Sequence, residues 1–468
     1  MAMPETIALR PFQQRCIHEL RQAYAHGSRA PLLVSPTGSG KTVMFCYIAQ
    51  AATAKRNKVL VLVHRRYLIE QVSSMLSRFG VDHDIVAPGH PHGSLDVKVA
   101  SVQTLARRLD WWEWKPDLVI VDEAHHVTPT TQWGRVLEAV QAPTLRILGV
   151  TATPQRLDGQ GLGDIFTSLV MGPTPAQLIN LGYLSQPILY APASGLDMSG
   201  AKTRGGDYAK EDVDAAIGRS VVIGSAVNHY RKYCIGERAL VFCSSVKRAE
   251  ETAQLFRESG VAAEMVDGKL SHHERSERLG RLESGHTSVI TSCDLISEGL
   301  DIPAVSAAFL LRPTKSLALY LQQVGRALRP WDGKERTIIF DHVANSTAQG
   351  HGLPQEDRDW TLDAGRKTNG SGKRPSKIRQ CPKCDYVDLI RDTCSQCGYV
   401  YPKKERKIGY EDGELVEVKR EAFDRKKQAL RNEVRGARTR ADLERIALNR
   451  GYKRGWVGIQ LKLKGLDR

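Results

Sequence analysis

The sequence has 468 residues, a formal net charge of +15 at pH 7 and a hydrophobic fraction of 41%. A chain of this length has room for roughly two to four domains. Its apolar content and its lack of low-complexity repeats exclude a disordered or fibrous protein. No run reaches the roughly eighteen apolar residues of a membrane helix, and residues 1–12 contain no apolar signal region. We therefore expect a soluble protein of the cytoplasm with no membrane partner.

The positive charge is concentrated near the C-terminus. Residues 1–363 contain 39 Lys and Arg against 38 Asp and Glu, whereas residues 364–468 contain 28 against 14. A basic terminal region is typical of proteins that bind a polyanion such as nucleic acid. The alternative is a solvated tail that serves only solubility.

The first predicted strand, residues 32–35, leads into a phosphate-binding loop. The loop reads Ser35-Pro-Thr-Gly-Ser-Gly-Lys-Thr42, with Ser35 at the position where the usual pattern has glycine. Its glycines let backbone N–H groups surround phosphate oxygens at the start of a helix. Lys41 would reach the β- and γ-phosphates, and Thr42 would supply a hydroxyl ligand for magnesium. We expect ATP and Mg²⁺ to be bound by Gly38, Ser39, Gly40, Lys41 and Thr42.

Further strands follow, and an acidic pair comes directly after one of them. Apolar runs at residues 59–63, 97–101, 118–121 and 146–150 alternate with helical stretches, which is typical of a parallel sheet with helices on both faces. Asp122 and Glu123 follow the 118–121 strand, at the edge where open α/β sheets bind their ligands. Asp122 suits a metal ion and Glu123 suits the activation of water. The pair therefore belongs to the predicted ATP site.

A second series of strands predicts a second parallel sheet, with helices at residues 246–259 and 272–284. On a later predicted helix, Arg326 and Arg329 are three residues apart and share a face. Two guanidinium groups presented from a second domain would stabilise charge that develops on a γ-phosphate. The alternative is a pair of surface arginines. The strands of this series are predicted at residues 239–242, 262–266, 288–291, 305–310 and 337–340.

The nine cysteines fall into two groups. Five are single and lie mostly within apolar segments, so we expect buried thiols. The other four form two Cys-x2-Cys pairs, and this spacing predicts a zinc site with four thiolate ligands. A disulfide framework is the alternative, and a cytosolic chain disfavours it. The predicted zinc ligands are Cys381, Cys384, Cys394 and Cys397; the single cysteines are Cys16, Cys46, Cys234, Cys243 and Cys293.

These patterns divide the chain into six parts. We predict a first domain (residues 1–171), a connector (172–225), a second domain (226–345), a flexible linker (346–379), a four-cysteine segment (380–402) and a basic helical tail (403–468). In the tail, one face of a predicted helix carries Leu443, Ile446 and Ala447, with Gly451 as its C-cap. A second apolar group there consists of Trp456, Ile459 and Leu463.

The order of these motifs resembles that of the superfamily 2 helicases and translocases. The resemblance implies an α/β fold with two tandem RecA-like parallel-sheet domains, here followed by a small zinc ribbon or knuckle and a short basic helical region. It rests on residues 9–13 (the adenine-reading glutamine motif), 35–42 (motif I), 122–125 (the DEAH form of motif II), 151–154 (motif III), 291–303 with Asp294, Gly299 and Asp301 (motif V), and 322–329 (motif VI).

The resemblance also implies a role for each matching residue. Adenine would be read by Gln13, and the nucleotide and its metal would be held by Lys41, Thr42, Asp122, Gly299 and Asp301. Hydrolysis would use Glu123, Arg326 and Arg329, and coupling to the bound strand would use His125, Thr151 and Thr153. Contacts to the nucleic-acid backbone would fall at His64, Arg65, Ser101, Gln103, Thr104, Ser244 and Thr291. For His64 and Arg65, phosphate binding and structural hydrogen bonding are equally suitable roles.

Within the superfamily, the layout most resembles bacterial and phage RadD-like DNA helicases, on residues 9–13, 182–187 and 312–316. That implies a nucleoid-associated protein of a bacterial or phage-infected cell. Its substrate would be single-stranded or forked DNA, in repair, recombination or replication, and its basic tail would have a protein partner. We thus expect an ATP-dependent DNA helicase or translocase whose ATPase is stimulated by nucleic acid.

Three alternative functions stay open. They are a translocase that moves on duplex DNA without separating its strands, an RNA helicase, and a zinc-dependent nucleic-acid-binding adaptor with an ATP switch. A strand-separating hairpin would favour the helicase. Residues 195–214, where such a hairpin would lie, show no diagnostic pattern.

Overall fold

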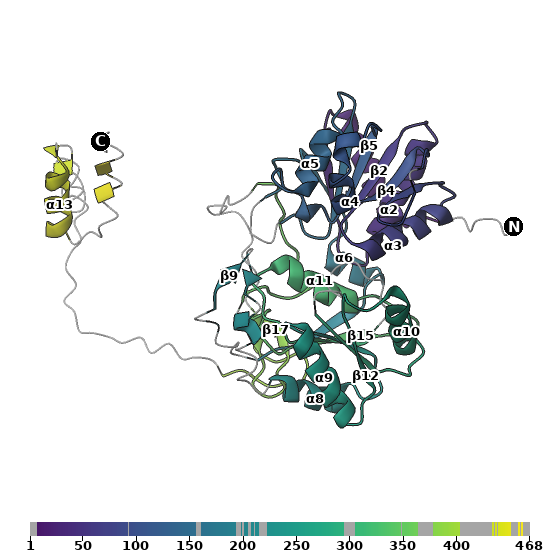
Figure 1. Ribbon diagram of the computed structural model, residues 1–468. Helices are drawn as coiled ribbons and strands as arrows, with labels where there is room; N and C mark the ends of the chain where they lie inside the picture. The colour runs from purple at the N-terminus through teal and green to yellow at the C-terminus, as the bar shows by residue number, and fades with distance from the viewer. Residues whose placement is uncertain are drawn as a thin grey trace. The chain divides into compact units, whose positions relative to one another are not determined.

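The chain forms two compact units, Met1–Tyr401 and Pro402–Arg468, whose elements are labelled in Figure 1. The first unit contains two parallel sheets and the four cysteines, and the second contains a small helical cluster. The computed structural model describes residues 7–91, 93–155, 161–192, 198, 201–204, 207–209, 211–214, 222–293, 305–347, 349–363, 378–402, 433–434, 436–437, 439–450, 457–458 and 460–461.

The first sheet has seven parallel strands in the order β3-β4-β2-β5-β6-β1-β7. Only β6 separates β1 from β5, so the segments that follow these three strands meet at one edge of the sheet. The strands are β1 (Pro31–Val34), β2 (Val59–Val63), β3 (Asp84–Val86), β4 (Val97–Ser101), β5 (Leu118–Asp122), β6 (Arg146–Thr151) and β7 (Ser168–Met171).

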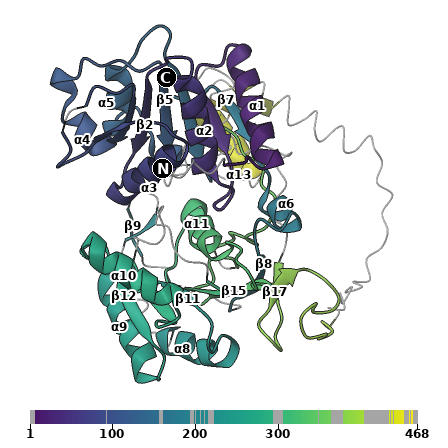
Figure 2. The same ribbon diagram turned by 90° about the vertical axis from the view of Figure 1, so that its right-hand side faces the viewer.

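Helices cover both faces of this sheet (Figures 1 and 2). In β2, Val59, Val61 and Val63 join one buried apolar cluster with α2 and α3, whereas Leu60 and Leu62 join another with α4 and α5. A strand that is buried on both faces has no solvent-facing position, which explains its uninterrupted Val and Leu. The helices are α1 (Pro11–Ala25), α2 (Lys41–Thr53), α3 (Arg66–Arg78), α4 (Val102–Ala106) and α5 (Gln132–Ala139), with short 3-10 turns at Leu109–Trp111 and Ala124–His126.

The second sheet has six parallel strands in the order β12-β13-β11-β14-β15-β8. Leu240 and Phe242 of β11 face one buried cluster, and Ala239 and Val241 face the other. The strands are β8 (Gln186–Tyr190), β11 (Ala239–Phe242), β12 (Ala263–Val266), β13 (Val289–Ser292), β14 (Ala307–Leu310) and β15 (Arg336–Asp341). The helices are α6 (Pro175–Asn180), α8 (Val222–Tyr233), α9 (Val246–Glu258), α10 (His272–Glu283) and α11 (Leu317–Ala327).

Strand β8 was not expected, because residues 186–190 fall in the predicted connector. They pair with β15 from Gln186 opposite Arg336 to Tyr190 opposite Phe340. Pro187 is tolerated because β8 lies at the edge of the sheet, where a strand can lack one backbone donor. The chain therefore enters the second sheet before it reaches the predicted start of the second domain.

Residues 349–363, which we call the strap, pack on both domains although they belong to the predicted flexible linker. Leu353 is buried in a cluster of the second sheet, whereas Trp360 and Leu362 pack against a cluster of the first. The backbone N–H groups of Leu162 and Gly163 donate to the Leu362 carbonyl at 2.9 and 3.0 Å. This part of the predicted linker is ordered by contacts, and residues 364–377 lie outside the described residues.

A short hairpin occurs within residues 195–214, where no hairpin pattern was recognised. It pairs β9 (Thr203–Arg204) with β10 (Asp207–Tyr208), and both views place β9 where the two domains meet (Figures 1 and 2). Asp207 accepts hydrogen bonds from the Lys315 N–H at 2.8 Å and from the Thr314 hydroxyl at 2.9 Å. Lys315 Nζ donates to the Thr203 hydroxyl at 2.7 Å. Strands this short are unstable alone, so the loop before α11 holds the hairpin in place.

The four-cysteine segment packs on the edge of the second sheet. It contains the antiparallel strands β16 (Ile378–Gln380) and β17 (Val387–Leu389). Tyr386 forms a β-bridge with Tyr190 of β8, and Val387 and Ile378 join the apolar cluster of the second sheet. The segment is therefore part of the first compact unit.

In the second unit, α13 (Arg440–Asn449) confirms the predicted apolar face. Leu443 and Ala447 are buried with Ala437, Val457 and Leu461, and Ile446 packs beside them. Thr439 and Asp442 form a capping box at its start. The predicted C-cap Gly451 and the residues Trp456, Ile459 and Leu463 lie outside the described residues. Among the residues that the structure describes, no helix is both long and apolar enough to span a bilayer.

Candidate nucleotide site and nucleic-acid surface

The phosphate loop joins β1 to α2 in the conformation that its glycines allow. Gly38 and Gly40 have φ angles of 88° and 80°, in the region that disfavours residues with a Cβ. Ser35, which replaces the usual glycine at the first position, is fully buried. It faces Gly172, where an added Cβ would lie 2.5 Å from the Ser35 hydroxyl oxygen. The hydroxyl of Ser35 is accommodated because its neighbour has no side chain.

Lys41 lies across this loop at the first position of α2. Its Nζ donates to the carbonyls of Ser35 and Pro36 at 3.2 and 3.4 Å. Desolvation lowers the pKa of Lys41, while the nearby carboxylates of Glu123 and Asp122 act in the opposite direction. A desolvated ammonium group beside backbone N–H groups at a helix start is a suitable site for phosphate oxygens.

Gln13 of α1 connects the first helix to the phosphate loop. Its side chain is buried; Nε2 donates to the Ser39 carbonyl at 3.0 Å, and Oε1 accepts from the Arg10 N–H at 2.9 Å. The Arg10 guanidinium lies 4.1 Å from the centre of the Tyr183 ring, and Phe12 packs on the same ring. The predicted adenine-reading segment and the 182–187 segment are therefore in contact.

The acidic pair lies at the carboxyl end of β5, with both side chains buried. Burial, reinforced by Glu123, raises the pKa of Asp122 to about 6. Burial alone would also raise the pKa of Glu123, but His125, Lys41 and Arg326 together lower it. Two buried carboxyl groups at one sheet edge offer the oxygen ligands that a divalent cation prefers. Asp122, with the Thr42 hydroxyl at the start of α2, is the donor set available for magnesium.

His125 lies between Glu123 and the end of β6. The Glu123 carboxylate lies 3.4 Å from His125 Nδ1, which is 3.0 Å from the Thr151 hydroxyl. That hydroxyl donates to the Thr153 carbonyl at 2.9 Å. The structure thus brings together the three residues predicted to couple hydrolysis to the bound strand.

The two predicted arginines lie at the C-terminal end of α11 in the second domain, with Arg326 in the last turn of the helix. Arg326 is buried, and its charge acts on both Lys41 and Glu123. Arg329, just beyond the helix, also acts on Lys41. At Gly325 an added Cβ would lie 2.8 Å from the Thr37 Cβ, so the helix approaches the phosphate loop closely. The structure therefore places Arg326 and Arg329 toward the nucleotide site.

Lys334 supports this helix and was not anticipated from the sequence. Its Nζ donates to the carbonyls of Ala327 and Arg329, where the end of α11 leaves carbonyls unpaired. Desolvation, with Arg238 nearby, lowers the pKa of Lys334 to about 7. A lysine near a helix C-terminus is a general signal for such a cap. Lys334 was not recognised as one because it follows the turn at Gly333, several residues after the helix end.

The predicted nucleic-acid contacts of the first domain gather at one edge of its sheet. A polar groove there is lined by His64, Gln103 and His126, together with Arg135 of α5. Gln103 Nε2 donates to the His64 carbonyl at 3.0 Å and Oε1 accepts from the Ser101 hydroxyl at 2.8 Å. Arg65 is exposed beside it, and Thr104 is buried at the start of α4, where its N–H donates to Ser101 Oγ.

The predicted contacts of the second domain are less accessible. The Ser244 hydroxyl donates to Asp214, and Arg248 Nη2 donates to the Asp214 carbonyl at 3.1 Å. Thr291 is fully buried and donates to the Ala249 carbonyl at 2.7 Å, so its side chain serves the packing of α9 on β13. Gly299 and Asp301 lie outside the described residues, as does Asp294.

The four paired cysteines form a cluster suited to a metal. Their sulfur atoms all lie within 4.8 Å of one another. The two pairs adopt the same local fold: Cys381 N–H donates to the Tyr386 carbonyl and Cys394 N–H donates to the Tyr399 carbonyl, each at 2.8 Å. Four converging thiols on matched turns fit a tetrahedral zinc ion. The five single cysteines are buried, as predicted.

Comparison with known proteins identifies the family. Residues 6–156 match the family described as type III restriction enzyme, res subunit, and residues 226–330 match the helicase conserved C-terminal domain. Together these ranges span more than half of the chain. The chain belongs to helicase superfamily 2. This superfamily 2 protein is an enzyme of the ATPase and helicase class, which acts on ATP and nucleic acid. The family predicted from the order of the sequence motifs is therefore confirmed.

Two relatives of the superfamily 2 chain extend over most of its length. A protein named "51.5 kDa protein" from a Lactococcus phage is 34% identical over 378 residues, which cover 80% of this chain and 79% of the relative. A candidate ATP-dependent helicase of Saccharomyces cerevisiae, IRC3, is 27% identical over 358 residues, which cover 72% of this chain and 52% of the relative. The chain thus spans about half the length of the yeast relative.

Solved structures share the fold of the superfamily 2 chain. A fragment of a candidate HsdR subunit of a type I restriction enzyme from Vibrio vulnificus matches with a TM-score of 0.59 and 21% identity, over 75% of this chain and 68% of that one. The ATP-dependent type ISP restriction-modification enzyme LlaBIII, solved bound to DNA, matches with a TM-score of 0.54 and 17% identity, over 72% of this chain and 28% of that one. Both confirm two RecA-like domains in tandem.

Proposed function

We propose that this chain is an ATP-dependent DNA helicase that moves along one strand of DNA. The observation that carries the proposal is the convergence of the phosphate loop, the acidic pair and Arg326 from three elements and two domains. A nucleotide held by both domains would favour their closed arrangement, and its hydrolysis would release it. Each cycle would then change the grip of the two domains on the strand.

The assignment of roles follows the geometry of the site. We propose that Lys41 and the loop backbone hold the phosphates, that Asp122 and Thr42 hold magnesium, and that Glu123 orients the attacking water. Arg326 and Arg329 would stabilise charge on the γ-phosphate. His125, Thr151 and Thr153 would transmit the change to the polar groove lined by His64 and Gln103, which is suited to phosphate contacts.

Lys41→Ala tests the site. Loss of the ammonium group should abolish ATP turnover while nucleic-acid binding by the groove and the tail remains. The matched control is Lys55→Ala, because Lys55 is exposed just beyond the other end of α2. Unchanged turnover in Lys41→Ala would exclude the assigned nucleotide site.

DNA is proposed as the substrate because the first domain matches a restriction-enzyme family. ATPase activity measured side by side with single-stranded DNA, duplex DNA and RNA tests this choice. Stimulation by single-stranded DNA is expected to exceed the other two. A larger effect of duplex DNA would favour a translocase that does not separate strands, and a larger effect of RNA would favour an RNA helicase.

The β9–β10 hairpin favours strand separation over movement on intact duplex. Hydrogen bonds hold the hairpin on the second domain through Asp207 and Lys315, and the Tyr208 hydroxyl donates to Gln349 Oε1 at 3.1 Å. A hairpin held by these contacts where the domains meet is suited to dividing two strands. Displacement of a labelled strand from forked DNA is the measurement that distinguishes a helicase from both a duplex translocase and an ATP-switched adaptor.

We further propose that the four cysteines hold one structural zinc ion. Closed four-thiolate sites contribute to folding rather than to chemistry, and this one lies far along the chain from the nucleotide-binding residues. Elemental analysis of the purified protein should find one zinc per chain. Finding none, together with intact disulfides, would instead indicate the disulfide alternative.

A further inference from the structure

The strap begins on the helix that carries the arginines. The Tyr320 hydroxyl of α11 donates to the Gly352 carbonyl at 3.1 Å, and the His351 ring stacks on the Tyr320 ring with their centres 5.3 Å apart. His351 Nε2 donates to the Thr314 carbonyl at 2.8 Å. Leu353 is then buried in the same apolar cluster as Tyr320 and Val324. The first part of the strap is thus fixed to one side of α11.

The middle of the strap is a compact turn held by Arg358. Its guanidinium donates to the carbonyls of His351 and Leu353, each at 2.9 Å, and of Glu356 at 2.8 Å. Three carbonyls on one guanidinium restrict the backbone between residues 351 and 358 to one shape. The turn therefore links the two ends of the strap through a hydrogen-bonded backbone.

The far end of the strap is fixed to the first domain. Trp360 and Leu362 pack against the cluster that includes Leu162 and Phe166. The Leu362 carbonyl accepts two backbone hydrogen bonds from residues 162 and 163. The strap therefore connects α11 to the first sheet through side-chain packing and backbone hydrogen bonds.

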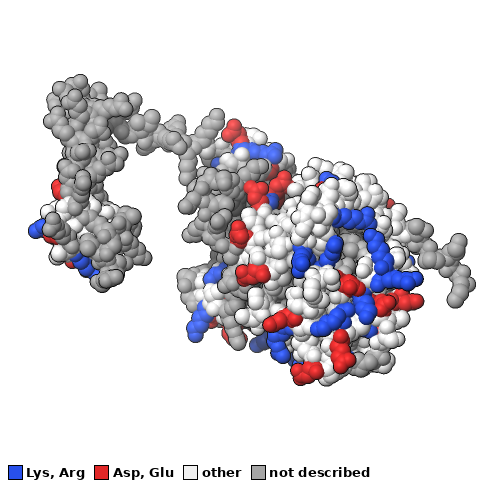
Figure 3. Space-filling model, turned by 90° about the horizontal axis from the view of Figure 1, so that it is seen from above, with Lys and Arg blue, Asp and Glu red and all other residues white. Residues whose placement is uncertain are grey.

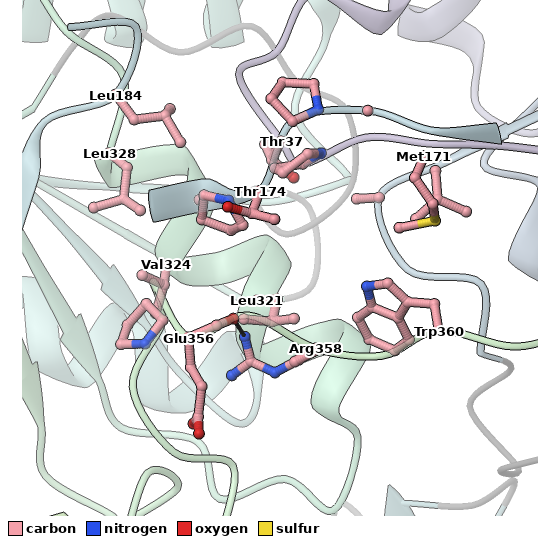
Figure 4. Close-up of a pocket in the computed structure, with 18 residues that line it drawn as sticks. Thr37, Met171, Thr174, Leu184, Leu321, Val324, Leu328, Glu356, Arg358 and Trp360 are labelled. Carbon is pink, nitrogen blue, oxygen red and sulfur yellow. Dashed lines mark hydrogen bonds between the residues drawn. The ribbon is translucent and has the colours of Figure 1, made fainter. Parts of the chain in front are cut away.

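Between α11 and the first domain lies an apolar pocket that the strap borders (Figure 4). Leu321 and Val324 of α11 face Thr37 of the phosphate loop and Met171 across it, and Trp360 lies at one side. The pocket is lined mainly by apolar side chains and is partly open to solvent. Because the space is incompletely packed, direct contact between α11 and the loop is confined to places such as Gly325 and Thr37.

We infer that the strap holds α11 against the phosphate loop when nucleic acid is absent, and that Trp360 and Leu362 are positioning residues for Arg326. The inference rests on the proposed ATPase function. Direct packing between α11 and the loop is narrow, so the strap supplies the second connection that fixes their distance. Bound DNA would hold both domains together by its own contacts and would make the strap less important.

Trp360→Ala combined with Leu362→Ala tests the inference. We expect kcat without nucleic acid to fall about tenfold, because Arg326 spends less time at the nucleotide. ATP affinity, measured with a fluorescent ATP analogue, should change less than twofold because the phosphate loop is intact. With saturating single-stranded DNA, kcat should fall less than twofold, so the stimulation by DNA increases.

The control is Leu448→Ala, which removes an exposed leucine from α13 in the second unit and should leave both rates unchanged. Trp360→Phe should retain most of the basal rate. Both strap residues are only partly buried, and thermal unfolding will show whether each variant folds; Leu362→Ala alone serves if the double variant does not.

The outcomes are distinct. Equal loss of kcat with and without DNA, or no loss in either, overturns the inference and leaves the proposed ATPase standing. No ATP turnover by the unaltered protein with any nucleic acid overturns the proposed function itself, and the inference with it.

Discussion

At the scale of single residues, Arg326 depends on parts of the chain far from it. Its helix is positioned by Gly325 against Thr37, by Lys334 at the helix end and by Tyr320 at the strap. A buried guanidinium beside Lys41 is unfavourable unless an anion lies near both. Glu123 supplies part of that negative charge, and a polyphosphate would supply the rest.

Replacing this guanidinium should therefore affect hydrolysis more than binding. In Arg326→Ala we expect kcat for ATP to fall by about a thousandfold, the range typical of arginines that stabilise phosphoryl transfer. ATP affinity should change by less than tenfold, because the first domain supplies the loop. Steady-state ATPase and equilibrium ATP binding are the measurements, and Arg281→Ala, on an exposed face of α10, is the control. Equal losses in kcat and in affinity would contradict the role.

A buried histidine predicts how stability depends on pH. The His342 ring stacks on His229 with centres 5.0 Å apart, and its Nε2 is buried without a hydrogen-bond partner in the described part of the chain. Burial, with His229 adding to it, lowers the pKa of His342 to about 3. In the unfolded chain this histidine has a pKa of about 6.5, so between pH 6.5 and 3 it binds a proton there but not in the folded protein. Stability is thus complete above pH 6.5 and is lost as the pH falls toward 3.

The effect can be isolated with His342→Phe. Between pH 8 and pH 5, His342 should lower the free energy of unfolding by about 2 kcal/mol, because each pKa unit corresponds to about 1.4 kcal/mol. Denaturant unfolding at both pH values should show a smaller acid loss in His342→Phe than in the unaltered protein. His26→Phe, at an exposed position, should behave like the unaltered protein. A parallel loss in both variants would contradict the low pKa.

At the scale of elements, the β9–β10 hairpin can be loosened without touching the nucleotide site. Lys315→Met removes the hydrogen bond to Thr203 and the contact of Nζ with the Tyr208 ring at 4.5 Å. Loss of contacts of this kind weakens the attachment of the hairpin by about 1.4 kcal/mol, which is a tenfold change in the equilibrium between its attached and detached states. We expect strand displacement from forked DNA to fall about tenfold while DNA-stimulated ATPase stays within twofold.

Two further variants separate the hairpin from the lysine itself. Thr203→Val loosens the same contact from the other side and should show the same imbalance between displacement and ATPase. Lys232→Met removes an exposed lysine of α8 and should change neither. If strand displacement and the ATPase rate fall by the same factor in the Lys315 and Thr203 variants, the hairpin has no separate role in dividing strands.

Much of the fold could be predicted from the sequence, because buried parallel strands are continuous apolar runs. All ten predicted strands are present with ends within two residues of those observed, and β2, β4 and β11 match in full. The elements that were missed carry weaker signals. Strand β8 contains Pro187, and the strap has few apolar residues, each of which packs on a distant partner. Their structure is set by tertiary contacts that a local pattern does not contain.

The candidate site shows the same division. The phosphate loop, the acidic pair and the arginines are short local patterns, and the structure brings them together. The accessibility of Thr291 and Ser244 could not be predicted, because it depends on Ala249 and Asp214, which lie elsewhere in the sequence.

At the scale of the whole molecule, charge is divided between the two compact units. The face in Figure 3 shows basic and acidic side chains interspersed on the first unit, in keeping with the near balance of residues 1–363. Residues 402–468 contain 20 Lys and Arg against 11 Asp and Glu. The second unit is thus the part best suited to sequence-independent attraction to phosphates.

Removal of residues 402–468 should therefore weaken DNA binding in a salt-dependent manner. Each phosphate contact that is lost should reduce the slope of log affinity against log salt by about 0.7 for single strands. Fluorescence anisotropy across a series of salt concentrations measures this slope. The kcat at saturating DNA should be unchanged, because the nucleotide site lies in the first unit. An unaltered slope would assign the tail to a solubility role.

Strand β8 has a consequence for how this enzyme can be dissected. A fragment that starts at residue 226, where the helicase C-terminal match begins, would lack β8. The backbone groups of β15 would then be exposed along a hydrophobic edge strand, which promotes aggregation. Tyr386 rests on that same strand, so truncation before residue 378 would uncover its other side. We therefore expect that a stable fragment of the second domain needs both β8, which begins at Gln186, and the four-cysteine segment that packs on it.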